Sequence, residues 1–186
     1  MYFEQFISDS EYSNLSDEFL SALNGAEYSS ILHYTDSGHT AINKTLSGIV
    51  EQEPAINEII SDIDSALTKA TPKKRLLYRG ASLKEFKPDN GTITFKSYFS
   101  ASYSPVQASK FIKSETNPVV YVIESEHGAE VSSIHDELEV LMPRDLTFTI
   151  VDVKENIEYT SLYFGTDYGV SVSNVTVVFL AQPVDK

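Results

Sequence analysis

The sequence predicts an α+β fold in which helices precede a largely antiparallel sheet. Residues 1–70 carry apolar patterns of helical period, whereas residues 71–186 carry short β-rich runs separated by Gly, Pro, Asn and Asp. Helices followed by strands are typical of helices packed against an antiparallel sheet. With 186 residues, we expect a single domain, made of a helical preface (1–70) and a β-rich core (71–186).

Three helices are expected in the preface. Residues 14–25 offer Ser16 as an N-cap and end at Gly25. Residues 37–48 offer Ser37 as an N-cap and end at Gly48. Residues 53–70 give the clearest signal, because a proline suits the first turn. Their apolar residues form a single stripe: Ile56, Ile59, Ile60, Ile63 and Leu67.

Seven strands and one more helix are expected after residue 71. The helix opens at Pro105 and covers residues 105–113. The strands are residues 76–80, 94–102, 117–125, 137–143, 146–153, 156–164 and 172–180.

Composition narrows the possible chemistry. Apolar residues make up 41% of the chain, enough to fill a core, and cysteine is absent, which excludes disulfides and thiolate chemistry. The histidines lack metal-ligand spacing, so we expect no metal and surface or loop roles for His33, His39, His127 and His135. The N-terminus lacks a basic start and an apolar run, and no stretch approaches the roughly 20 apolar residues of a membrane span. We therefore expect a soluble cytoplasmic protein with no membrane partner.

Charge is unevenly distributed along the chain, whose net charge is −13. Residues 1–70 hold 12 acidic and 2 basic side chains, residues 71–115 hold 3 and 9, and residues 116–186 hold 12 and 3. The overall balance disfavours direct nucleic-acid binding. The basic middle segment predicts a small anionic ligand, with a chance cluster of solvated lysines as the alternative.

The stretch "HDELEVLMPR" (135–144) places Glu137 and Glu139 two residues apart in an apolar strand. In a regular strand their side chains would share one face, roughly 6.6 Å apart. A solvated sheet face is one interpretation. The other is a pair of carboxylates acting at a glycosidic carbon, one stabilising an oxocarbenium-like centre and one handling a proton.

Two further motifs carry polar groups. In "LLYRGAS", Arg79 could bind phosphate or ribose oxygens and Gly80 would admit a ligand close to the backbone, although a surface arginine is the alternative. In "TFKSYFSAS", the hydroxyls of Ser100 and Ser102 could orient a neighbouring carboxylate. A serine nucleophile is disfavoured, because no histidine or G-x-S-x-G elbow accompanies them.

The order Arg, Ser-x-Ser, Glu-x-Glu resembles the mono-ADP-ribosyltransferases of the arginine–serine–glutamate class. "LHYTDSGHTAINKTL", "YRG", "FSAS" and "ELEVLMPRDLTFTI" are similar to that family's motifs, in the family's order, over residues 28–155. The resemblance implies an ADP-ribosyltransferase fold, with N-terminal helices packed on a split two-sheet core and NAD⁺ in the cleft. It also implies transfer of ADP-ribose from NAD⁺ to arginine side chains, with release of nicotinamide.

The resemblance also implies roles for single residues. Glu139 would bind the nicotinamide-ribose hydroxyl and stabilise the oxocarbenium ion, and Glu137 would engage the acceptor guanidinium. Ser100 would hold Glu139, Ser102 would support the ribose pocket, and Arg79 would bind phosphate and ribose.

Four more residues match the family's NAD⁺ site, at Gly80, Tyr34, Asn43 and Phe111. Gly80 would offer its backbone to the nicotinamide amide, and Phe111 would stack on the nicotinamide ring. The sequence departs from the family at Ala101, where threonine is usual. It also lacks the arginine that often follows the stacking aromatic, for which Lys113 is a substitute.

Small size and the short "SASY" strand look most like the tailed-phage enzymes Alt and Mod. Those enzymes modify host proteins, notably RNA polymerase, and bacterial effectors and toxins share the same core. We therefore expect an arginine-bearing host protein as partner, attracted by the acidic flanks. Residues 125–136 are expected to form a mobile loop that recognises it.

Three other functions fit parts of the pattern. An NAD glycohydrolase would use the same cleft with water as acceptor, and an inactive module would keep the fold for binding alone. A sugar hydrolase is the least favoured, because no aromatic sugar platform is evident and it leaves Arg79 unexplained.

Overall fold

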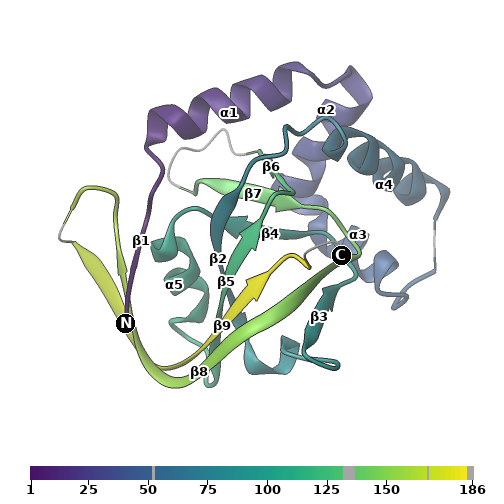
Figure 1. The fold of residues 1–186 in the computed structure, drawn as a ribbon. Helices are drawn as coiled ribbons and strands as arrows, with labels where there is room; N and C mark the ends of the chain where they lie inside the picture. The colour runs from purple at the N-terminus through teal and green to yellow at the C-terminus, as the bar shows by residue number, and fades with distance from the viewer. Residues whose placement is uncertain (52, 132–136, 167, 184–186) are drawn as a thin grey trace.

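The chain adopts the predicted α+β architecture, with helices at the N-terminal end of the sequence and strands after them (Figure 1). This computed structural model describes residues 1–51, 53–131, 137–166 and 168–183. Among those residues, no helix is long and apolar enough to cross a membrane.

The N-terminal half folds into helices whose bounds differ in part from those expected. The helical elements are α1 (Asp9–Ser21), α2 (Gly25–His33), a π-helical turn (Tyr34–Gly38), α3 (His39–Leu46) and α4 (Pro54–Leu67). The helix expected at 53–70 is confirmed as α4, with Pro54 in its first turn. The helix expected at 37–48 is realised as α3, but Ser37 lies in the π-helical turn and does not cap it.

The predicted bounds of the first helix, 14–25, are wrong. Helix α1 begins eight residues earlier than its expected Ser16 cap would allow, because the Ser8 hydroxyl accepts a hydrogen bond from the Glu11 amide at 3.2 Å and caps the helix instead. Gly25 starts α2 instead of ending α1. Asn24 and Glu27 close a capping box in front of α2, with hydrogen bonds of 3.0 and 2.8 Å.

The strands follow the predicted order with four differences. The expected run 94–102 divides into two strands, the runs 146–153 and 156–164 merge into one irregular strand, and β1 and β6 are additional. The strands are β1 (Tyr2–Glu4), β2 (Arg75–Ser82), β3 (Thr92–Phe95), β4 (Phe99–Ser102), β5 (Pro118–Ser125), β6 (Ala129–Glu130), β7 (Glu139–Met142), β8 (Leu146–Leu162) and β9 (Gly169–Ala181). A short 3₁₀ turn (Leu83–Glu85) follows β2, and α5 (Pro105–Ile112) follows β4.

These strands form one mixed sheet within the described residues, in the order β1-β8-β9-β5-β2-β4-β7-β6, with β3 paired to β8. Two pairings, β1 with β8 and β5 with β9, are parallel and the rest are antiparallel. The two halves of the expected split sheet are joined between β2 and β4 through a single register pair, Tyr78 with Ser102. The two expected sheets are therefore continuous, but the joint between them is narrow.

Three apolar clusters fix the layers around this sheet. Helices α2, α3 and α4 cover one side of β7, where Leu141 joins their cluster, while Val140 and Met142 enter the central cluster on the opposite side. Helix α5 packs on β2, β5 and β9 through a third cluster that includes Ile112. Strand β7 is thus buried on both faces, which holds Glu139 at its start in a defined position.

A buried ion pair connects the beginning of β2 to β6. The Arg75 guanidinium donates to both carboxylate oxygens of Glu130, at 3.0 and 3.1 Å, and Tyr103 donates to the same carboxylate at 2.8 Å. Glu130 lies in the segment 125–136 that was expected to be a mobile loop. That prediction is wrong at Ser125, which ends β5, and at Ala129 and Glu130, which form β6 and are buried. Residues 132–136 lie outside the described residues.

We predict that Glu130→Leu lowers the free energy of unfolding by about 3–5 kcal/mol, because it leaves the Arg75 guanidinium buried without a counter-charge. Urea denaturation followed by circular dichroism would measure the change. Glu124→Leu is the matched control, since Glu124 pairs with Lys74 at an exposed site, and it should leave the unfolding midpoint nearly unchanged. Equal midpoints for the two variants would contradict the role of this pair.

Candidate active site

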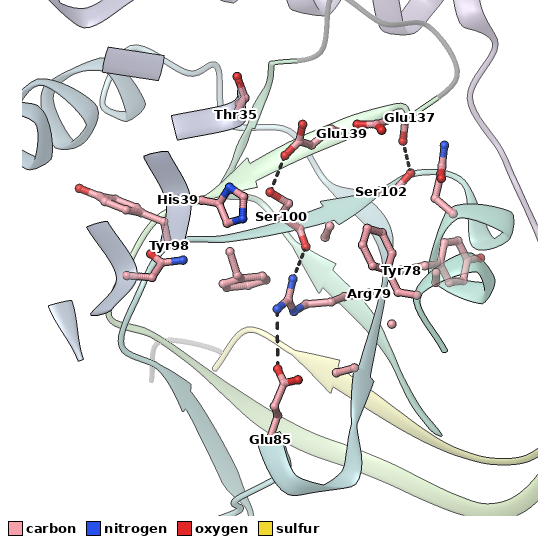
Figure 2. A pocket seen from close by; sticks show the side chains of 18 of the residues that line it. Thr35, His39, Tyr78, Arg79, Glu85, Tyr98, Ser100, Ser102, Glu137 and Glu139 are labelled. Carbon is pink, nitrogen blue, oxygen red and sulfur yellow. Dashed lines mark hydrogen bonds and ion pairs between the residues drawn. The ribbon is translucent and has the colours of Figure 1, made fainter. Parts of the chain in front are cut away.

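A cavity of about 460 Å³ lies between the π-helical turn, α3, α5 and strands β2, β4 and β7. Its size falls within the range of small-molecule sites. Figure 2 shows several of its side chains converging on the joint between the two halves of the sheet. All nine residues predicted from the sequence line it: Tyr34, Asn43, Arg79, Gly80, Ser100, Ser102, Phe111, Glu137 and Glu139.

Glu139 is fixed by contacts from two other elements, β4 and α1. Its carboxylate accepts a hydrogen bond from the Ser100 hydroxyl on β4, and its backbone carbonyl accepts one from the Tyr12 hydroxyl on α1 at 2.6 Å. Burial raises the pKa of Glu139, and the neighbouring Glu137 carboxylate raises it further. The Ser100 hydrogen bond and the nearby His39 imidazole lower the same pKa. The carboxylate is therefore held in place at a substantial cost in desolvation.

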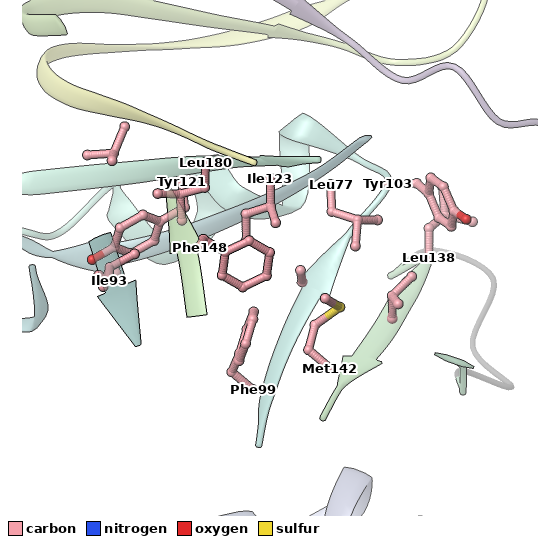
Figure 3. Close-up of a cluster of buried hydrophobic side chains, with 14 of the residues drawn as sticks. Leu77, Ile93, Phe99, Tyr103, Tyr121, Ile123, Leu138, Met142, Phe148 and Leu180 are labelled. Atoms are coloured by element: carbon pink, nitrogen blue, oxygen red, sulfur yellow. The ribbon is translucent and has the colours of Figure 1, made fainter. Parts of the chain in front are cut away.

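The sequence predicted that Glu137 and Glu139 share a regular strand, but the structure shows that they do not. Strand β7 begins at Glu139, and Leu138 adopts a left-handed backbone conformation with φ of 46°. The Leu138 side chain is buried in the central cluster near Tyr103 and Met142 (Figure 3). Both glutamates still line the pocket. The separation of roughly 6.6 Å that a regular strand would give their side chains does not apply.

Ser102 holds the backbone beside Glu137 and not its carboxylate. Its hydroxyl donates to the Glu137 carbonyl oxygen at 2.6 Å and accepts from the Ser104 amide at 2.9 Å. The two serines of "FSAS" thus act on different atoms: Ser100 on the Glu139 carboxylate and Ser102 on the Glu137 main chain.

Arg79 lies across the pocket from the two glutamates. Its Nη1 donates to the Ser100 carbonyl oxygen at 2.8 Å, and its Nη2 lies 3.8 Å from a carboxylate oxygen of Glu85. The guanidinium carbon is 5.6 Å from the centre of the Phe99 ring. Its Nε is buried and has no partner among the described residues, while about a quarter of the whole side chain stays exposed.

Gly80 permits the close approach of α5 to β2. A Cβ at this position would overlap the carbonyl oxygen of Ala108 and would press on Ile112 and Phe111. Phe111 projects from α5 at the rim of the pocket with 70% of its surface exposed. Gly80 therefore determines the position of the Phe111 ring at the rim of the pocket.

The π-helical turn brings Tyr34 and His39 to the same side of the chain. A π-helical turn places residues five apart near one another, and the two rings meet edge-on at 6.2 Å. The Tyr34 hydroxyl accepts from the Asn43 amide at 3.0 Å, and burial raises the pKa of Tyr34. Asn43 Oδ1 is buried with no partner among the described residues.

His39 is exposed, as expected, but it begins α3 and also lines the pocket, a placement the sequence did not predict. An α-helical pattern gave no reason to pair it with Tyr34, whereas the five-residue spacing in "YTDSGH" becomes informative once a π turn is considered. Glu85, Gln107 and Glu115 also line the pocket and had no signal in the sequence.

The basic segment of the sequence contributes less to the pocket than predicted. Of the lysines and arginines in residues 71–115, Arg79 is the one that lines the pocket among the described residues. Arg75 forms the buried ion pair with Glu130. Lys113 is the exposed C-cap residue of α5 and lies outside the pocket. Within the described residues no cluster of His, Asp and Glu could hold a metal.

The profile of the ADP-ribosyltransferase exoenzyme family matches residues 9–94 and 87–170. No curated protein matches the sequence.

Several solved structures share the fold at low identity. The enzymatic component C2-I of the C2 toxin from Clostridium botulinum gives a TM-score of 0.71 at 20% identity, over 95% of this chain and 48% of that chain. The toxin BECa of C. perfringens, solved with NADH, gives 0.66 at 21%, over 91% and 47%. The ADP-ribosyltransferase Vis, solved with agmatine, gives 0.64 at 19%, over 96% and 87%, and is a toxin from Vibrio splendidus.

The chain spans about half the length of C2-I. The predicted ADP-ribosyltransferase fold is confirmed by these likenesses together with the family profile.

We predict that Ser100→Ala raises the pKa of the Glu139 carboxyl, because it removes the hydrogen bond that stabilises the ionised form in a buried site. The carboxyl would then take up its proton at a higher pH than in the unmodified protein. Titration of ¹³C-labelled glutamate carboxyls by NMR would measure this. Ser102→Ala is the control, since Ser102 bonds a main-chain carbonyl. A shift of the Glu139 pKa in Ser102→Ala that equals or opposes the shift in Ser100→Ala would contradict the prediction.

We predict that Gly80→Ala displaces α5 from β2 and lowers the free energy of unfolding by about 1–3 kcal/mol, the usual cost of overpacking. Thermal unfolding would show the loss. Gly25→Ala is the matched control, because a Cβ at Gly25 meets no atom within 4 Å. Similar melting temperatures for the two variants would show that the close approach at Gly80 does not constrain the fold.

Proposed function

The chain belongs to the ADP-ribosyltransferase exoenzyme family, and from that premise we propose that it transfers ADP-ribose from NAD⁺ to arginine side chains of target proteins, releasing nicotinamide. The observation that carries the proposal is the placement of Glu139, held by Ser100, opposite Arg79 in one pocket that also contains Glu137.

The donor half of the reaction would use Glu139 and Arg79. The bond that breaks joins the nicotinamide nitrogen to the ribose, and its electron pair leaves with nicotinamide. The ribosyl carbon then carries positive charge, which a fixed carboxylate at Glu139 stabilises. Arg79 would bind the diphosphate, because it carries a permanent charge and its side chain is partly exposed in the pocket.

The acceptor half would use Glu137. A guanidinium pairs well with a carboxylate, because its planar donors match the two oxygens. Glu137 would hold the acceptor arginine, take its proton as the nitrogen attacks the ribosyl carbon, and leave the new N-glycosidic bond on the arginine. No other described element supplies a second carboxylate next to Glu139 in this pocket.

The solved relatives support both halves without defining them for this chain. BECa was solved with NADH, which is consistent with a dinucleotide donor, and Vis was solved with agmatine, which carries a guanidinium group. For this chain, NAD⁺ as donor and arginine as acceptor are part of the proposal.

We propose further that the target is a host-cell protein, such as RNA polymerase, and that the chain acts in the host cytoplasm as a phage or bacterial effector. The resemblance of its motifs to Alt and Mod supports this choice. Mass spectrometry of a bacterial lysate treated with labelled NAD⁺ would map the target and the modified residue. Label on residues other than arginine would overturn the assigned acceptor.

Two alternative functions are separated by simple measurements. A glycohydrolase would release free ADP-ribose and label no acceptor, whereas a transferase would label agmatine or protein. An inactive binding module would show no nicotinamide release, even if calorimetry detected NAD⁺ binding.

We predict that Glu139→Gln lowers nicotinamide release by about 10²–10³-fold, because it removes the charge that stabilises the ribosyl cation. Glu137→Gln should keep a substantial part of NAD⁺ hydrolysis and lose transfer to agmatine. Chromatography of nicotinamide, ADP-ribose and ADP-ribosyl-agmatine would measure both reactions in each variant. Glu58→Gln, on the exposed side of α4, serves as control. Parallel loss of hydrolysis and transfer in both pocket variants would overturn the division of roles.

A further inference from the structure

A second cavity, of about 550 Å³, adjoins the catalytic pocket and plays no part in the proposed reaction. It lies between the segment that joins β1 to α1, helix α5 and the end of the β8–β9 hairpin. Figure 1 shows that hairpin end beside the start of α1. Two residues connect the cavities. Gln107 lines both of them, and Leu138, which lines the second, directly follows Glu137, which lines the first.

One wall of the second cavity is aromatic and open to solvent. Tyr163 and Phe164, which follow β8, line it and are about half exposed. The hairpin holds them in place, because the Tyr163 amide donates to the Tyr168 carbonyl at 3.2 Å and β1 pairs with residues 160–162. Phe6 and Tyr168, on the adjoining segments, are exposed as well. Aromatic rings exposed on neighbouring segments mark an interaction surface more often than scattered ones do.

The other walls of the second cavity suit a polypeptide. Among the described residues that line it, Asp9 and Lys110 are the charged ones, so their charges balance and favour neither an anion nor a metal ion. Hydroxyl and amide side chains line it too, and such groups can bond to the N–H and C=O groups of a main chain. Aromatic rings pack well on apolar side chains. The cavity therefore combines what a main chain and an apolar side chain require.

We propose that the second cavity docks the acceptor protein and holds a bulky apolar side chain that lies next to the acceptor arginine in its sequence. This inference rests on the proposed function, which places that arginine at Glu137. Neighbouring Cα atoms are about 3.8 Å apart, so the step from Glu137 to Leu138 matches one residue of the acceptor. A segment whose arginine reaches Glu137 therefore carries a residue one or two positions away past Leu138 into the second cavity.

Charge disfavours two other occupants of this surface. An anionic membrane would meet the exposed acids Glu4 and Asp9, which line cavities beside Tyr163. A second copy would bring together two chains of net charge −13. The positive charge of an acceptor arginine is instead attracted by the same acids. The acceptor protein is the occupant that both the position and the charge of the cavity favour.

Small acceptors separate docking from chemistry. Agmatine has a guanidinium but no flanking residues, so its transfer does not need the second cavity. The purified chain would receive agmatine and five pentapeptides: one with a central arginine between glycines, and four in which phenylalanine replaces one glycine. Kinetics of ADP-ribose transfer from NAD⁺ would give kcat and KM for each acceptor. At least one phenylalanine peptide should show a KM about tenfold below that of the all-glycine peptide, because its ring leaves water.

Variants of the aromatic wall should remove this preference. Phe164→Ser and Tyr163→Ser should raise the KM of the preferred peptide toward that of the all-glycine peptide, while agmatine transfer stays as it was. Phe164→Leu should keep most of the preference, because leucine retains an apolar side chain there. Tyr28→Ser is the matched control, since Tyr28 on α2 is 41% exposed, against 45% for Tyr163, and lines neither cavity. It should leave every KM unchanged.

Equal KM values for all five peptides, or a preference that Phe164→Ser and Tyr163→Ser both retain, would overturn the docking role. Binding to vesicles of phosphatidylcholine and phosphatidylglycerol, or sedimentation as a dimer, would also overturn it if Phe164→Ser abolished that property, because the surface would then serve a membrane or a second copy.

Failure of the proposed function looks different, because neither agmatine nor any peptide would then be modified. Fluorescence anisotropy of the labelled peptides would still test the cavity, since binding needs no transfer. Tighter binding of a phenylalanine peptide that Phe164→Ser weakens, and Tyr28→Ser does not, would support the docking role even then. Equal binding of all five peptides would overturn it.

Discussion

The register row of Tyr78, Ser102 and Glu139 joins the two halves of the sheet, and the pocket depends on it. Tyr78 pairs with Ser102, and Ser102 pairs with Glu139. Because β2 and β4 share only this one register pair, the row sets how Arg79 on β2 faces the glutamates beside β4. The hydroxyl of Tyr12 adds a tie from α1 to the Glu139 main chain. A slip of one residue at this joint would turn the polar side chains of β4 to the opposite face.

The charged side chains of the pocket are held by groups on neighbouring elements. Ser100 on β4 contacts two of these side chains, because its hydroxyl donates to Glu139 while its carbonyl accepts from Arg79. The same residue thus lowers the cost of burying a carboxylate and orients the guanidinium opposite it. A single serine on β4 therefore couples Glu139 to Arg79, the residues proposed to face the ribosyl cation and the diphosphate.

Local sequence patterns predicted the elements that depend on local physics. The apolar stripe of α4 and the buried strand β5 were found, and the motifs around Arg79 and Glu139 brought nine residues to one pocket. Other features depend on contacts distant in sequence. Strand β1 exists because three residues pair with the far end of β8, and Gly25 could end one helix or begin the next until the Asn24 and Glu27 capping box was seen. His39 was missed because its position depends on a π turn, which an α-helical period does not reveal.

The unequal environments of the two glutamates trace to the backbone of Leu138. A non-glycine residue in the left-handed region costs on the order of 1–3 kcal/mol, and two interactions offset it: the buried Leu138 side chain and a 3.2 Å hydrogen bond from the Tyr103 amide to its carbonyl. Because the chain turns there, Glu139 starts a strand buried on both faces, whereas Glu137 stays outside the strand, where Ser102 holds its main chain. A regular strand would have given both carboxylates the same support. Under the proposed function, the turn leaves Glu139 fixed, as stabilisation of a cation requires, and leaves Glu137 outside the strand, on the side proposed for the acceptor.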